Sequence, residues 1–223
     1  MIPKLIVANW KMAVDLDAVR AFEGEWNDCP AVTTADVVVA PPAVFVHHAA
    51  ALHGVSLCGQ DVSIHSAGAH TGEVSAAMLK ALGCRYGIVG HSERRSGHSE
   101  TNAVIAEKAL RLETEGLRPI ICVGESLLER QSGGAESVIA AQVTESCRGL
   151  NTVPIIAYEP VWAIGSGESA SPNDVVAMHR HIKQTLDQAF AADVPVLYGG
   201  SVNPKNCTQF TARPEVNGLL VGG

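Results

Sequence analysis

Eight short runs of β-branched and other apolar residues recur along the chain, and segments rich in Ala, Leu, Glu and Arg separate most of them. The expected strands are residues 5–9, 37–40, 55–59, 86–89, 119–123, 154–158, 196–198 and 218–221. The clearest helical segments are residues 15–26, 102–115, 135–148 and 172–190. Such alternation implies parallel strands joined by right-handed crossovers. Eight units in 223 residues predict a closed (β/α)8 barrel, a fold that typically takes about 250 residues.

An open, doubly wound sheet is the alternative, but no Gly-x-Gly-x-x-Gly string follows the first strand. No low-complexity linker divides the sequence, so we expect residues 1–223 to form a single domain. Hydrophobic residues make up 47% of the chain and aromatic residues only 4%. The core should therefore consist mainly of Ala, Val, Leu and Ile.

Charge and cysteine usage limit the possible partners. The net charge of −7 disfavours nucleic acid, because phosphate backbones bind basic faces, but a few local donors can still hold one small phosphate. The six cysteines form no Cys-x-x-Cys pair, so we expect buried thiols of a reducing compartment and no metal site. No apolar stretch reaches the roughly 18–20 residues of a membrane span, and no signal segment is recognisable. We expect a cytoplasmic protein without membrane contact.

Polar side chains stand where three of the predicted strands end. Asn9 and Lys11 end the first strand, two positions apart, so an extended chain points both the same way. His91 and Glu159 follow the fourth and sixth strands. The carboxyl ends of parallel strands meet at one mouth of a barrel, where barrel enzymes hold their sites. We therefore expect a cation, an electrophile and a base around a small anionic substrate, although a lone lysine at a strand end is often simply solvated.

His91 precedes a polar segment that we expect to begin a helix. The exposed amides of a helix N-terminus disfavour the imidazolium, so a neutral ring would donate a hydrogen bond to a carbonyl. Glu93 lies two residues on, where it would pair with Lys11 or Arg95. A structural histidine beside an ordinary surface cluster of ion pairs is the alternative.

Glu159 is the candidate base, because an apolar cover over a carboxylate desolvates it and strengthens it as a base. The expected cover is the apolar lid of residues 161–164, with Gly165 and Gly167 as a hinge. The same apolar residues would otherwise be ordinary core. Glycine turns at residues 199–201 and 222–223 follow the last two strands, where barrels of this kind often bind phosphate.

Five strings at these strand ends resemble the triosephosphate isomerase family, and the resemblance covers essentially the whole chain. They are Ala-Asn-Trp-Lys-Met at 8–12, Gly-His-Ser-Glu-Arg-Arg at 90–95, Tyr-Glu-Pro-Val-Trp-Ala-Ile-Gly at 158–165, Tyr-Gly-Gly-Ser at 198–201 and Val-Gly-Gly at 221–223. The resemblance implies a TIM barrel that interconverts dihydroxyacetone phosphate and D-glyceraldehyde 3-phosphate in glycolysis and gluconeogenesis. It implies an enediolate intermediate and no cofactor.

The resemblance also implies a role for each polar group. Glu159 would carry a proton between two carbons while neutral His91 polarises the carbonyl. Lys11, supported by Asn9, would stabilise the phosphate and the enediolate. Ser92 would hold Glu159 before substrate binds, and Glu93 would position the cation and the imidazole. The amides expected to bind phosphate are those of Gly165, Ser201, Gly222 and Gly223.

The stretch 60–73 has little helix or strand character. A mobile surface loop is the simple interpretation. The family resemblance instead implies an arm that interdigitates in a homodimer. Its marks would be Gln60, Thr71, Gly72 and Glu73, with Glu73 paired to the partner's Arg94. His70 replaces the aromatic residue that the family commonly has, which predicts a weaker and pH-sensitive dimer.

The family pattern continues past the last strand with a turn and a final helix, whereas this sequence ends at Gly223. A barrel that lacks its final C-terminal helix would expose the last strand and place a carboxylate at the phosphate site. Such a chain is expected to bind substrate poorly. The alternatives to an active isomerase are therefore a catalytically weak or inactive truncated barrel scaffold and another phosphosugar enzyme on the same fold.

Overall fold

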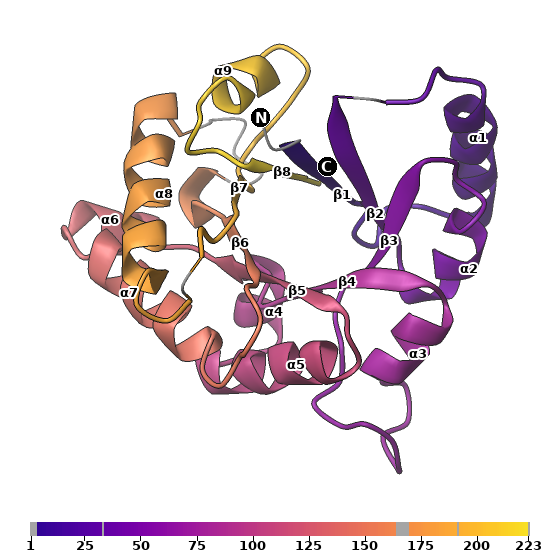
Figure 1. Cartoon of the computed structure of the whole chain (residues 1–223), viewed down its shortest axis with the longest axis horizontal. Coiled ribbons are helices and arrows are strands. Elements are labelled where there is room, and N and C mark those ends of the chain that lie inside the picture. The colour runs from indigo at the N-terminus through magenta and orange to yellow at the C-terminus, as the bar shows by residue number, and fades with distance from the viewer. Residues whose placement is uncertain (1–3, 33, 164–169, 191, 223) are drawn as a thin grey trace.

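The computed structural model describes residues 4–32, 34–163, 170–190 and 192–222. Within them, eight parallel strands pair in chain order, and β1 closes the ring by pairing with β8 (Figure 1). The strands are β1 (Lys4–Asn9), β2 (Ala35–Ala40), β3 (Val55–Gly59), β4 (Cys84–Val89), β5 (Arg118–Val123), β6 (Ile155–Tyr158), β7 (Val196–Tyr198) and β8 (Gly218–Val221). The predicted (β/α)8 barrel is therefore confirmed, and the alternative of an open sheet is wrong.

Helices form an outer layer around the strands (Figure 1). The longer ones are α1 (Leu16–Asn27), α5 (Asn102–Thr114), α7 (Ala135–Ser146) and α8 (Pro172–Leu186). The shorter ones are η1 (Ala43–Phe45), α2 (Val46–Ala49), α3 (Ala76–Ala81), α4 (Ser92–Gly97), α6 (Leu127–Gln131), η2 (Val161–Ala163) and α9 (Cys207–Thr211). In the described part of the chain, none of these helices combines the length and apolarity that crossing a membrane requires.

Side chains that point alternately to the two faces of each strand divide the buried residues into two clusters. One cluster includes Val7, Ile120 and Leu197, and all its buried members lie on strands, with every strand contributing at least one. These residues fill the interior of the barrel. The neighbours Ile121 and Tyr198 belong to the larger cluster between strands and helices. This division is the expected result of successive side chains pointing to opposite faces of a strand.

Capping side chains set where helices begin. Asp15 accepts the N–H of Ala18 at 2.8 Å and so caps α1. Ser171 caps α8, which begins at Pro172 as predicted. The same helix ends earlier than predicted, at Leu186. Phe190 nevertheless stays buried in the core beyond the end of the helix, so the apolar pattern continues where the helix does not.

Candidate active site

A small pocket of about 40 Å³ lies at the carboxyl ends of the strands. Its lining residues are Asn9, Lys11, His91, Glu159, Gly199, Gly200, Ser201, Leu220 and Gly222. Barrel closure therefore brings together the strand ends that the sequence singled out. The space suits a few water molecules, so wall side chains must move when a larger substrate enters. Among the described residues, no group of three or more His, Cys, Asp or Glu side chains is placed to hold a metal ion.

Lys11 follows β1 and has a left-handed backbone, with a φ of 50°. Its N–H donates to Asn9 Oδ1 at 3.0 Å, which holds the backbone in this conformation. Its ammonium donates to Glu93 Oε1 at 2.7 Å. Gly222 leaves room for the side chain, because a Cβ there would lie 2.9 Å from Lys11 Cε. Asn9 and Gly222 thus fix the place of the predicted cation.

Glu159 follows β6, and only 2% of its side chain is exposed. One carboxylate oxygen lies 3.0 Å from His91 Nε2, and the other accepts the N–H of Ser92 at 2.9 Å. The backbone of Ser92, rather than its hydroxyl, makes this contact. A carboxylate held in this way must leave both partners before it can reach a substrate.

His91 caps α4, and its Nδ1 accepts the N–H of Glu93 at 3.2 Å. The proton of a neutral ring therefore sits on Nε2, which faces Glu159. Burial lowers the pKa of His91, but the hydrogen bond and charge of Glu159 outweigh it and raise that pKa above its usual value. If Glu159 turns toward a substrate, this support is lost and burial favours the neutral ring. The predicted neutral electrophile therefore requires that Glu159 has moved.

Glu93 links the cation to the imidazole. Besides its contact with Lys11, its second oxygen lies 3.6 Å from His91 Nδ1. Burial disfavours the charged form, but the hydrogen bond from Lys11 and the charges of His91 and Lys11 hold the pKa of Glu93 below its usual value. Arg95, the other partner considered for Glu93, instead donates to the carbonyl of Cys122 at 3.0 Å.

The predicted phosphate ligands fall into two groups. Ser201 and Gly222 line the small pocket, and the Ser201 hydroxyl donates to the carbonyl of Ala163 at 2.5 Å. Ala163 is buried in η2, the described part of the expected lid. The remaining positions lie outside the described residues: Gly165 and Gly223 of the phosphate site, and Ile164 and Gly167 of the lid.

Cys122 lies on β5 inside the barrel and is fully buried. Burial raises the pKa of its thiol well above the usual value, and the charge of Glu159 adds to this effect. A thiol that stays protonated near neutral pH is a poor nucleophile. Cys122 is therefore a packing residue rather than a reactive one.

Comparison with known proteins identifies the family. The family model described as Triosephosphate isomerase matches residues 4–223. The chain belongs to the triosephosphate isomerase family. It is 47% identical over 230 residues to the triosephosphate isomerase of Thermus thermophilus, covering 98% of this chain and 92% of that protein. It is 46% and 44% identical to those of Acidiphilium cryptum and Herpetosiphon aurantiacus, over 99% and 98% of this chain and 92% of each relative.

Membership of the triosephosphate isomerase family confirms three expectations from the sequence: the family itself, the TIM barrel and the class of aldose–ketose isomerases. The residues that the family model matches, 4–223, span the positions of all five strings. The matches identify the family and the enzyme class, whereas the role of each side chain depends on the geometry described above.

The predicted arm projects from the barrel between β3 and α3 and contains no helix or strand (Figure 1). Gln60, at its start, donates to the carbonyl of Lys11 at 2.8 Å. Glu73, at its end, accepts a hydrogen bond from the Ser63 hydroxyl. Thr71 is exposed. The arm is thus tied to the active-site strand at one end and to itself at the other.

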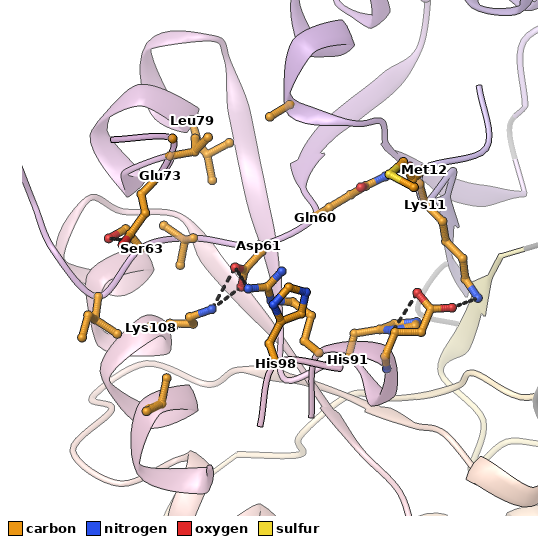
Figure 2. Close-up of a pocket in the computed structure, with 18 of the residues that line it drawn as sticks. Lys11, Met12, Gln60, Asp61, Ser63, Glu73, Leu79, His91, His98 and Lys108 are labelled. Carbon is orange, nitrogen blue, oxygen red and sulfur yellow. Dashed lines mark hydrogen bonds and ion pairs between the residues drawn. The ribbon is translucent and has the colours of Figure 1, made fainter. Parts of the chain in front are cut away.

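Arg94, which the resemblance pairs with Glu73 of a second subunit, has partners within its own chain. Its Nη2 lies 3.0 Å from Asp61 Oδ2, and its Nε donates to Glu100 Oε1 at 2.7 Å. Lys108 binds the same two carboxylates, at 2.7 and 2.6 Å. Asp61, Arg94 and Lys108 line a second and larger pocket of about 670 Å³, which adjoins the first (Figure 2).

Sequence reasoning missed one buried carboxylate beside the site. Glu125 is fully buried, and its Oε1 accepts the Tyr158 hydroxyl at 3.0 Å and the Trp162 indole N–H at 2.9 Å. These two residues stand on either side of Glu159 in the sequence. The position of Glu125 in the sequence could have indicated it. Glu125 lies two residues after the end of β5, just as Lys11 lies two residues after the end of β1.

Proposed function

We propose that the chain interconverts dihydroxyacetone phosphate and D-glyceraldehyde 3-phosphate, a step of glycolysis and gluconeogenesis. The observation that supports it is the meeting of Glu159, His91 and Lys11 at one pocket. The reaction needs a base for a carbon-bound proton, a donor for an oxygen that gains charge, and a cation near both anionic groups. Each of the three side chains meets one of these needs.

In the proposed reaction, the Glu159 carboxylate takes a proton from the carbon beside the carbonyl. The electron pair moves to the carbonyl oxygen and forms an enediolate, to which His91 Nε2–H donates. His91 then helps the hydroxyl proton pass between the two oxygens, and Glu159 returns its proton to the neighbouring carbon. Lys11 stabilises the negative charge throughout. No atom or electron is gained or lost, so the step needs no cofactor.

We assign the phosphate to the glycine turns after β7 and β8. Ser201 and Gly222 line the pocket there, and Gly165 and Gly223 complete the proposed set of ligands. Backbone amides in such turns can approach an anion closely. Closing the lid of residues 161–164 would exclude water and protect the enediolate from losing phosphate.

We further propose that the chain forms a homodimer through the 60–73 arm. Met12 lines the larger pocket with 97% of its surface exposed (Figure 2). Val44 and Met78, each next in sequence to a lining residue, are 77% and 55% exposed. Exposed apolar side chains on and beside the wall of a pocket support a contact surface there. A partner's Thr71 would approach Lys11, and its Glu73 would approach Arg94.

The test is an assay of triose phosphate isomerisation with Glu159→Gln as the variant. We expect the unaltered chain to turn over and the variant to lose roughly 10²–10⁴-fold in kcat, the usual contribution of a general base. Glu107→Gln, the same change on the exposed face of α5, should keep full activity. A folded chain without turnover would favour the inactive scaffold, and an active Glu159→Gln variant would remove Glu159 from the role of base.

A further inference from the structure

The buried Glu125 carboxylate has no role in the proposed chemistry. Its Oε1 receives hydrogen bonds from Tyr158 and Trp162, while its Oε2 is buried with no hydrogen-bond partner among the described residues. Its backbone carbonyl also accepts the N–H of Val161 at 3.1 Å. Burying a carboxyl group is costly unless hydrogen bonds or a cation compensate for the water that it loses.

Arg130, on α6, is that cation. Its Nη1 lies 3.4 Å from Glu125 Oε1, and its Cζ lies 4.8 Å from the centre of the Trp162 ring. Its Nη2 lies 3.0 Å from Asp174 Oδ1 on α8. A guanidinium is planar and rigid, so contacts with a carboxylate, an aromatic face and a second carboxylate fix its position. Arg130 therefore connects the segment around Glu159 to the first turn of α8.

Asp174 is itself held firmly. Its Oδ2 accepts the hydroxyl of Ser171 at 2.6 Å, and its own N–H donates to the Ser171 oxygen at 3.2 Å. The helix cap thus fixes one carboxylate oxygen and leaves the other for Arg130. Asp174 does not line the active-site pocket, and 48% of its side chain is exposed.

We propose that Asp174 is a positioning residue, which acts through Arg130 and Glu125 on the residues that flank the base. Glu125 holds Tyr158 on one side of Glu159 and Val161 and Trp162 on the other. The backbone there is close-packed, since a Cβ on Gly124 would lie 1.8 Å from the carbonyl oxygen of Glu159. If Arg130 loses its contact with Asp174, it no longer fixes Glu125, and the hydrogen bonds that Glu125 accepts from the residues beside the base weaken. The proposal needs the proposed isomerase function only for its kinetic readout.

The first experiment compares Asp174→Asn with the unaltered chain in steady-state kinetics. We expect a two- to fivefold lower kcat with KM unchanged, roughly the effect of one half-exposed ion pair. Asp174→Glu should restore most of the loss. Raising salt from about 0.1 M to 1 M shortens the screening length from about 10 Å to 3 Å. It should lower kcat of the unaltered chain toward that of Asp174→Asn and affect the variant less.

A double-mutant cycle tests the route through Arg130. In an Arg130→Gln background, Asp174→Asn should cause no further loss of kcat. An equal additional loss would show that Asp174 acts by another path and would overturn the proposal. Thr101→Ala is the matched control, because it removes the side-chain cap of α5 but none of the contacts that join Asp174, Arg130 and Glu125. It should lower Tm and leave kcat unchanged; if it lowers kcat as much as Asp174→Asn does, helix stability is the cause and the proposal fails.

The indole N–H resonance of Trp162 gives a readout that needs no turnover. Asp174→Asn should shift it, because its acceptor Glu125 loses an anchored partner. Trp26 is an internal control, since its indole N–H donates to the carbonyl of His53 at 2.9 Å, away from this network. A Trp162 signal unchanged in Asp174→Asn would overturn the proposal whatever the enzyme's activity. An unaltered chain without turnover, combined with a shifted Trp162 signal, would count against the proposed function alone.

Discussion

The two adjoining pockets share Asn9, Lys11 and His91 but differ in size and in the residues that surround them. At the small pocket of about 40 Å³, the Lys11 ammonium donates to Glu93 and the His91 ring lies against the Glu159 carboxylate. The large pocket of about 670 Å³ is open, and the exposed Met12 forms part of its wall. The described residues of one chain line the small pocket, whereas the size of the large pocket and the exposed Met12 on its wall support the proposed contact with a second chain. Because they share a wall, assembly and activity should be coupled.

Removing the shared cation should have the largest effect. Lys11→Met deletes the ammonium and leaves Glu93 facing an anionic substrate, so we expect kcat/KM to fall roughly 10²–10³-fold. Lys80→Met is the matched control, since Lys80 also pairs with a glutamate, Glu115 at 3.7 Å, but lines neither pocket. Steady-state kinetics of both variants measure the difference. A Lys11→Met enzyme that kept a tenth of its activity would show that the small pocket does not depend on this charge.

A charge introduced at the rim of the large pocket should weaken assembly without replacing any residue that lines the small pocket. Met12→Asp loses apolar burial in the proposed dimer and buries a charge, so we expect the dimer Kd to rise at least about 100-fold. Leu128→Asp is the control, because Leu128 is 76% exposed on α6 and lines neither pocket. Sedimentation equilibrium measures both. Equal Kd values for the two variants would mean that the large pocket is not where a partner sits.

The parts of the barrel that the sequence predicted are those that depend on local pattern. Short β-branched runs located the strands to within a few residues, and closure of the barrel then placed Lys11, His91 and Glu159 together. The overestimate at the end of α8 has a physical cause. Phe190 packs into the core from outside the helix, and apolar spacing does not distinguish that from one more helical turn.

The contacts that the sequence did not predict are between side chains of separate elements. Arg94 pairs with Asp61 within one chain, although the family pattern pointed to Glu73 of a partner. Arg130 reaches Asp174 across 44 positions of sequence that carry no periodic signal for the contact. Such contacts depend on rotamers and on the exact distance between α6 and α8, which no local pattern records.

Acid should weaken the barrel through a residue in neither pocket. His179 is fully buried on α8, and burial lowers its pKa to about 3. The unfolded chain, with an ordinary histidine, binds a proton that the folded chain does not between pH 6.5 and about 3, so stability is complete above 6.5 and falls below it. At about 1.4 kcal/mol per pH unit, lowering the pH from 7 to 5 costs about 2 kcal/mol.

Urea unfolding at pH 7 and pH 5 measures this loss. His179→Gln keeps a donor near the carbonyl of Glu215, 3.3 Å from Nδ1, but does not titrate in this range. Its stability should therefore fall less between the two pH values than that of the unaltered chain. A variant that lost as much stability as the unaltered chain would assign the acid sensitivity to other groups.

The stacked pair of histidines on the arm should have the smallest effect on assembly. The rings of His65 and His70 stack in parallel, with centroids 3.6 Å apart and planes 3° apart. We expect His70→Ala, which removes this contact and loosens the arm, to raise the dimer Kd about two- to tenfold, the effect of losing one aromatic pair. His70→Phe keeps a ring on His65, so its Kd should stay near that of the unaltered chain. His47→Ala, exposed on α2, is the control and should leave the Kd unchanged. A Kd that His70→Ala leaves unchanged would mean that the walls of the large pocket, rather than the stacked pair of the arm, govern assembly.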